Sequence, residues 1–400
     1  MRQTPASSTI RRHVAAGLCA SLIGIGLARF AYTPLIPPMI RARWFSANDV
    51  VYLGAANLGG YLLGAVLGRP IAARLTHVQT LRAMMVLVSA SLLACAFPFS
   101  IGWFFAWRLI SGVAGGVIMV LVAAAVLPHV PSDRRGLASG AIFLGIGVGI
   151  AASGTLLPLL LKVGLRETWI GLGVLSALLT AATWTGWPRE ELHRVAPPLA
   201  RGRRDTRWSV ALVYTQYALM AVGLVPPMVF LVDFIARGLG AGESVGSFFW
   251  ILYGIGAILG PPVYGFIADR LGAQAAVRLL LLTQAAAVAG LAVVRRAFPI
   301  GLLAMIVGSF PPGIVPMTLA RIREIHPDDA TQQNIVWSRA TIVFAAFQAI
   351  AAYAYSGLFA ASGGNYQQLF AVGAGAISLA LALGVLAPFL PGGRRAVAGR

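Results

Sequence analysis

The chain alternates long apolar runs with short polar segments along nearly its whole length. A helix needs about 20 apolar residues to cross about 30 Å of hydrocarbon, and twelve runs are long enough to do so. They occupy residues 14–40, 50–68, 82–100, 102–127, 136–161 and 166–186 in the first half, and 208–233, 245–268, 274–294, 298–320, 333–360 and 366–390 in the second. Alternating segments of about ten residues, which are typical of transmembrane strands, are absent from the sequence. The pattern therefore predicts an all-α membrane protein with twelve transmembrane helices.

Two similar segments lie at matching places in the two halves of the chain. GAVLGRPIAARL (64–75) ends the second apolar run, and GAILGPPVYGFIADRLG (256–272) ends the eighth. Only the later copy has an acidic residue, Asp269, because Ala73 stands at the matching position of the first. Duplicated hydrophobic halves are typical of secondary transporters, whose substrate sites lie between the repeats near the bilayer midplane.

Composition favours a chain embedded in a lipid bilayer. Hydrophobic residues make up 58% of the 400 and charged residues 11%, whereas a soluble protein has about 25% charged residues. Mean hydropathy is +0.81. The net charge of +19 could indicate nucleic-acid binding, but the basic residues lie at the ends of apolar runs instead of on one polar face. We therefore expect no nucleic-acid partner.

The basic residues also orient the predicted helices. With both termini in the cytosol, 21 of the 31 Lys and Arg residues fall in inner segments and only seven in outer loops, which the positive-inside rule favours. The predicted organisation is an N-terminal six-helix bundle (1–186), a Pro- and Arg-rich cytosolic linker (187–208) and a C-terminal six-helix bundle (209–400). We expect a multi-pass protein of the cytoplasmic (inner) membrane of a bacterium, working as a monomer.

The sequence offers little for catalysis or for binding a metal or cofactor. Cys19 and Cys95 lie in apolar runs without motif spacing, and the five His residues fall near the inner ends of the runs. Ser-His-Asp sets and P-loops are absent from the sequence. We therefore expect no enzyme activity, no cofactor and no metal site.

Several motifs resemble the major facilitator superfamily of transporters over essentially the whole chain. GFIADRLG (265–272) is similar to the loop motif of that family, Arg108-Leu-Ile-Ser-Gly112 is similar to its fourth-span pattern, and the Gly-rich run 145–158 resembles the fifth span of its antiporter-like members. Residues 24–39, GIGLARFAYTPLIPPM, are similar to the opening span of the YbfB/YjiJ branch. The resemblance implies two pseudo-symmetric six-helix bundles that rock about a central site. It also implies a conformational latch at Gly265, Asp269, Arg270 and Gly272.

Arg29 and Arg108 are the strongest candidates for binding substrate. An Arg inside a span costs from about 3 to more than 10 kcal/mol unless it faces the protein interior or water. At 1.5 Å per residue, Arg29 lies about 22 Å above the inner face and Arg108 about 9 Å below the outer face, which is nearly the same depth. Two guanidinium groups at one level suit a carboxylate or phosphate. The alternative is that each binds backbone carbonyl groups and braces the helices.

Three further residues could line the same cavity. Tyr32 lies three residues after Arg29, on nearly the same helical face, and is equally well suited to packing. Arg339 and Gln348 lie in the eleventh run, and Arg339 is close enough to its inner end to reach the surface. The sequence thus predicts a substrate site made of Arg29, Tyr32, Arg108, Arg339 and Gln348.

The positions of the acidic residues narrow the choice of cargo. No Asp or Glu lies in the middle of a predicted span, and carboxylates are the usual proton carriers of membrane transporters. We therefore expect a secondary transporter for a small organic anion. Two alternatives are an efflux pump for hydrophobic or amphipathic compounds, which the Gly-rich fifth run favours, and a non-transporting membrane sensor or membrane-embedded enzyme.

Overall fold

The computed structural model describes residues 7–131, 134–188, 206–327 and 329–387, except for a few side chains that include Asp269. All regular secondary structure in these residues is helical. In the first half the elements are α1 (Ser7–Ser21), η1 (Leu22–Phe30), α2 (Tyr32–Arg41), α3 (Ala47–Arg74), α4 (His77–Ala94), α5 (Ile101–Val126), η2 (Leu127–His129), α6 (Arg135–Leu160) and α7 (Leu165–Ala182). In the second half they are α8 (Arg207–Asp233), η4 (Phe234–Gly238), α9 (Glu243–Leu271), α10 (Ala273–Val293), α11 (Ala297–Ile325), α12 (Ala330–Ala361) and α13 (Tyr366–Leu386).

Ten helical segments of the described chain are long and apolar enough to cross a membrane. One of them joins α1, η1 and α2 into Ser8–Arg41, and another joins α8 and η4 into Arg207–Gly238. The helices α3 and α7 are not among the ten. Helix α7 has only 18 residues, with a charged pair near its start. In α3 a few residues near the start are not fully described, and the ten segments are counted over described residues only. The all-helical prediction is confirmed, while this criterion supports ten spans.

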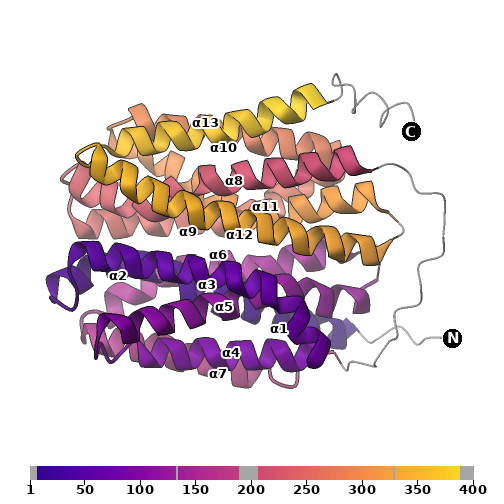
Figure 1. Ribbon diagram of the computed structural model, residues 1–400, viewed down its shortest axis with the longest axis horizontal. Coiled ribbons are helices and arrows are strands. Elements are labelled where there is room, and N and C mark those ends of the chain that lie inside the picture. Colours follow the sequence, from indigo (N-terminus) through magenta and orange to yellow (C-terminus); the bar gives the residue numbers. More distant parts are fainter. Residues whose placement is uncertain (1–6, 132–133, 189–205, 328, 388–400) are drawn as a thin grey trace.

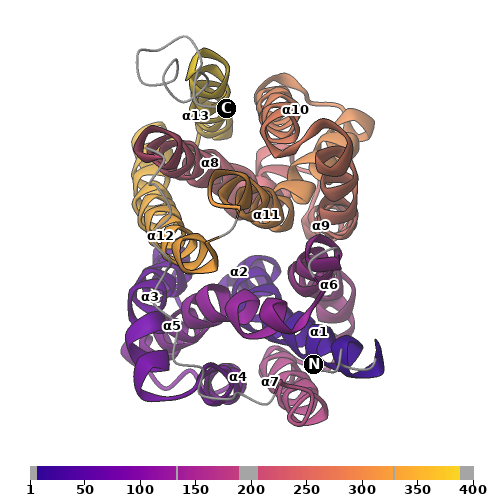
Figure 2. The ribbon, with the colours of Figure 1, turned by 90° about the vertical axis from the view of Figure 1, so that its right-hand side faces the viewer.

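The helices of the first half of the chain, α1 to α7, and those of the second half, α8 to α13, form two separate parts of the molecule. In Figures 1 and 2, the indigo-to-magenta helices lie below and the orange-to-yellow helices lie above. Contacts between them come mainly from α6 against α9 and α3 against α12. Helix α1 begins, and α13 ends, at the right-hand end in Figure 1, which we call the terminal end. Helix α8 also begins there.

Glycines let helix backbones touch inside each half and across the interface. A Cβ atom on Gly112 or Gly116 of α5 would overlap a backbone carbonyl group of α3, and one on Gly256 of α9 would overlap the carbonyl group of Met305 in α11. Gly147 of α6 packs in the same way on Ala257 of α9, which belongs to the other half. Small residues allow such close packing where lipid supplies no hydrophobic driving force. The glycines of α5, α6 and α9 thus form surfaces for helix packing.

The substitution Gly256→Ala tests this close contact. The new Cβ must push α9 and α11 apart, so we expect the free energy of unfolding to fall by about 1–3 kcal/mol. Gly375→Ala is the matched control, because its Cβ would meet open space, and Ala favours a helix over Gly by about 1 kcal/mol. Both are measured by denaturant unfolding of purified protein in detergent. Equal stability of the two variants would contradict the packing argument.

Candidate substrate site

Arg29 lies on the π-helix η1, in the middle of the first membrane-crossing segment. This nine-residue stretch contains Gly24 and Gly26, which bring its backbone against Gly115 of α5 and Gly149 of α6. A π-helix has a wider turn than an α-helix and is often found at functional sites. The sequence thus places Arg29 on an irregular backbone that is held on two sides by glycine contacts.

The Arg29 side chain reaches from the first half of the chain to the second. Its Nη1 donates a hydrogen bond of 2.9 Å to Oε1 of Gln348 on α12, and its Nε donates one of 3.4 Å to Oδ1 of Asn57 on α3. Its Cζ lies 4.2 Å from the ring centroid of Tyr61. Nη2 is buried without a hydrogen-bond partner, although the residue as a whole is only half-buried. Of the predicted site residues, the structure therefore brings Arg29 and Gln348 together.

Asn57 fixes one side of this contact. Its Nδ2 donates a hydrogen bond of 2.9 Å to Oγ of Ser111 and one of 3.4 Å to the carbonyl oxygen of Arg108, both on α5. Tyr61 follows Asn57 by one helical turn, so both side chains lie on the same face of α3. On the other side, Nε2 of Gln348 lies 3.9 Å from Sδ of Met228 on α8. Asn57 and Gln348 are each at most 2% exposed, so the groups that hold Arg29 are fixed by packing.

Arg108 lies beside this contact but is engaged elsewhere. Its Nη1 donates a hydrogen bond of 2.6 Å to the carbonyl oxygen of Ala28, and its Cζ lies 4.2 Å from the ring centroid of Tyr32. Tyr32 in turn donates a hydrogen bond of 2.6 Å from its hydroxyl to the carbonyl oxygen of Val50. Bonding to the residue before Arg29 places Arg108 at the same depth as Arg29, as the sequence predicts. Its contacts match the bracing alternative, since they hold η1 against α5.

Arg339 is separate from the Arg29–Gln348 contact. It is exposed on α12 and forms a side-chain hydrogen bond with Tyr214 of α8. This bond lies within the second half, more than two helical turns from Gln348 along the same helix. The structure therefore places Arg339 outside the group of side chains around Arg29.

Positive charge at the site has no acidic partner in the described part of the chain. The two ion pairs among these residues join Arg237 to Asp233 and Arg321 to Glu324. Asp233 also accepts a hydrogen bond of 2.7 Å from the hydroxyl of Tyr366, so it is occupied at the end opposite the terminal end. The charge on Arg29 is balanced only by dipoles and by the face of an aromatic ring, an arrangement that favours an anionic ligand.

The expected latch segment joins α9 to α10 at the terminal end. Gly272 has φ +79° and is the single residue between the two helices, a conformation that favours glycine. Arg270 is exposed, with its Cζ 4.3 Å from the ring centroid of Phe266, and a Cβ on Gly265 would meet open space. The Asp269 side chain lies outside the described residues.

A carboxylate from another helix supports this segment. Oε1 of Glu324 on α11 accepts a hydrogen bond of 2.7 Å from the backbone N–H of Ala273, the first residue of α10, and Oε2 accepts one of 2.7 Å from Arg321. In the first half, α4 is capped by its own residues, because Thr76 and Gln79 form a reciprocal capping box. The two matching loops are thus capped by different means.

Sequence reasoning missed Tyr61, Met228 and Glu324. The signal for Tyr61 was its position one turn after Asn57 on α3. Met228 reaches Gln348, and Glu324 reaches Ala273, only through tertiary packing, so no spacing in the sequence indicates either contact.

Replacing each arginine by Lys separates bracing from ligand binding. Arg108→Lys cannot keep both the Ala28 hydrogen bond and the stacking on Tyr32, so we expect the free energy of unfolding to fall by about 1–3 kcal/mol. Arg29→Lys should cost less in the ligand-free protein, because that side chain is half-buried with one nitrogen unpartnered. Thermal unfolding of both variants without ligand measures the difference. A larger loss in Arg29→Lys would contradict the assignment of Arg108 as the brace.

Comparisons with known proteins show the family to which the chain belongs. The family model described as "Uncharacterised MFS-type transporter YbfB" matches residues 21–385. A protein of Thermoproteus tenax described as "Uncharacterized 38 kDa protein in 23S RNA operon" is 32% identical over 200 residues, which cover 48% of this chain and 49% of that protein. This chain thus aligns with about half the length of that relative. The family match spans η1 to α13 and includes both arginines, so the chain belongs to the YbfB-like family of major facilitator superfamily transporters.

Proposed function

We propose that this protein is a secondary transporter that moves a small organic anion across the cytoplasmic membrane by alternating access. The observation that carries the proposal is the Arg29 guanidinium group. It lies between the two halves of the chain, has no acidic partner, and keeps one buried nitrogen without a hydrogen bond. A carboxylate or phosphate supplies both the missing charge and the missing acceptor.

The Arg29–Gln348 hydrogen bond links substrate binding to motion. In the proposed cycle a bound anion takes the place of the Gln348 oxygen on the guanidinium group. The only described hydrogen bond of Arg29 to the second half is then broken, and the halves are free to rearrange. A ligand shifts such an equilibrium only through different interactions in the two states, and this exchange is one such difference.

The remaining architecture follows from the same proposal. Counting α3 and α7 with the ten segments gives twelve transmembrane helices in two six-helix bundles, joined by the linker 187–208. The terminal end then faces the cytosol, as the Lys and Arg distribution favours. We assign Arg29 and Gln348 to substrate binding, and we assign Arg108 and Tyr32 to support η1 beside it. Arg339 contributes positive charge near the cytosolic mouth.

Efflux of amphipathic compounds is the alternative function. The sequence argument for efflux was the glycine run of α6. In the structure Gly145 and Gly149 pack against α1 and η1, and Gly147 packs against α9. Helix packing accounts for these glycines, so they no longer favour efflux over anion transport. A sensor or an enzyme has no supporting observation in the described part of the chain.

The two variants Gln348→Glu and Gln348→Met test the anion site at one position. Glu places a carboxylate on Arg29 and competes with substrate, so we expect affinity to fall at least about tenfold. Met keeps a similar volume and no charge, so its affinity should stay within about tenfold of wild type. Arg29→Lys keeps the charge but loses the planar fork and should also weaken binding.

The measurement is counterflow in proteoliposomes with labelled carboxylates and phosphate esters, followed by affinity determination for the ligand that exchanges. Equal loss in the Glu and Met variants would show that charge at Arg29 does not matter. A preferred cationic ligand would defeat the anion proposal and restore efflux to first place.

We further propose that Gly265, Asp269, Arg270 and Gly272 form a latch that holds one conformation. Support comes from the Gly272 turn and from Glu324, which ties the start of α10 to α11. A carboxylate at a helix end can bind a helix N-terminus or an Arg and so stabilise one arrangement.

Asp269→Asn removes the latch charge and keeps the side-chain shape. Because coupling energies of conformational switches are typically about 1–3 kcal/mol, we expect the transport rate to change about fivefold or more. Thermal unfolding should match wild type, and Asp205→Asn in the linker gives the same charge change as a control. Wild-type transport in the Asp269 variant would show that Asp269 only forms the turn.

A further inference from the structure

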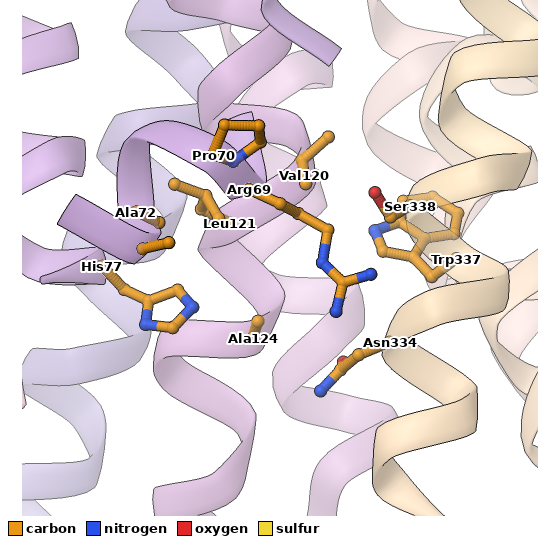
Figure 3. A pocket seen from close by; sticks show the side chains of 11 residues that line it. Arg69, Pro70, Ala72, His77, Val120, Leu121, Ala124, Asn334, Trp337 and Ser338 are labelled. Atoms are coloured by element: carbon orange, nitrogen blue, oxygen red, sulfur yellow. The ribbon is translucent and has the colours of Figure 1, made fainter. Parts of the chain in front are cut away.

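A cavity lies at the terminal end, far along the helices from Arg29. Its volume is about 520 Å³, and α3, α4, α5 and α12 form its walls. Figure 3 shows it from close by, with Arg69 extending from α3 toward α12. The residues on α12 belong to the second half of the chain and all the others to the first, so the cavity straddles the interface between the halves.

Four polar side chains around this cavity, those of Arg69, Asn334, Trp337 and Ser338, have no partner among the described residues. Trp337 is only 3% exposed, yet its indole N–H has no hydrogen-bond acceptor, and in Figure 3 this nitrogen faces the cavity. The guanidinium group of Arg69 forms no hydrogen bond or ion pair with the described residues. The same is true of the side chains of Asn334 and Ser338, which lie on the α12 wall.

These groups share a chemical preference. An indole N–H and a guanidinium group can only donate hydrogen bonds, and an amide and a hydroxyl can donate as well. The described residues of the lining include no Asp or Glu, while Pro70, Val120 and Leu121 supply an apolar surface. A buried donor without an acceptor costs about 1–3 kcal/mol, so an acceptor from outside the protein is favoured.

We propose that this cavity binds a phosphate group that carries an apolar chain, held by Arg69 and the Trp337 N–H. The planar fork of Arg matches the oxygen atoms of phosphate, and the apolar wall accommodates the chain. The ligand touches α3 and α5 on one side and α12 on the other, so its binding stabilises the arrangement of the halves seen here. This site goes beyond the proposed function and does not depend on what binds at Arg29.

Two binding measurements test the proposal and distinguish two sources of the ligand. Equilibrium dialysis with hexyl phosphate tests a free amphipathic anion, and native mass spectrometry with phosphatidylglycerol tests a lipid from the bilayer. Both use the purified full chain in detergent, as wild type and with Arg29→Gln. We expect one molecule of at least one probe to bind, with equal affinity in both backgrounds. Binding that is lost in Arg29→Gln would assign the probe to the Arg29 site and overturn this proposal alone.

Four variants locate the bound phosphate. Trp337→Phe removes the N–H and keeps the ring, and Arg69→Gln removes the charge, so each should weaken binding by roughly ten- to a hundredfold. Arg74→Gln makes the same charge change five residues along α3 but does not line the cavity, and Trp208→Phe changes an exposed Trp elsewhere. Both controls should bind as wild type does. The proposal fails if neither probe binds, or if Arg69→Gln and Trp337→Phe bind as tightly as their controls.

Discussion

The arrangement around Arg29 depends on one constraint, which is that a guanidinium charge inside a membrane protein must be compensated. Here compensation comes from neutral groups only: an amide oxygen from each half and the ring of Tyr61. Neutral dipoles stabilise a cation less than a carboxylate does, and they leave room for an anion to compete. A carboxylate of the protein paired with Arg29 would neutralise its charge, and the guanidinium group would then be less able to bind an anionic ligand. The arrangement thus leaves one buried nitrogen of Arg29 without an acceptor.

Positioning this charge requires rigid surroundings, and the glycine contacts supply them. The π-helical segment is fixed by backbone contact with α5 and α6, while the Arg108 guanidinium binds the carbonyl group of the residue before Arg29. The contact of α6 with α9 is equally close but crosses between the halves, through Gly147 and Ala257. Close backbone contact through small residues therefore links the two halves to each other as well as the helices within each half.

Much of the fold could be predicted because hydrophobic run length is a local property. The expected boundaries of α5, α6, α10 and α13 lie within a few residues of the observed ones. The first helix begins earlier than expected, at Ser7, because helical hydrogen bonding continues through polar residues such as Arg11 and Arg12. The depth argument brought Arg29 and Arg108 to one level, but it could not tell which way each side chain turns. Side-chain direction depends on partners far away in sequence, and for that reason Gln348 was only one candidate among several.

The different capping of the two matching loops has a consequence for the mechanical independence of the halves. The loop before α4 contains its own cap, so its residues can be lengthened or displaced without disturbing another helix. The turn before α10 is capped by Glu324 of α11. Any displacement of that turn must therefore break this hydrogen bond or move α11 with it. An inserted tag or fluorescent reporter should be accommodated in the first loop and rejected by the second. The two matching segments, alike in sequence, thus differ in what caps the helix that follows: local residues in the first half and a side chain of another helix in the second.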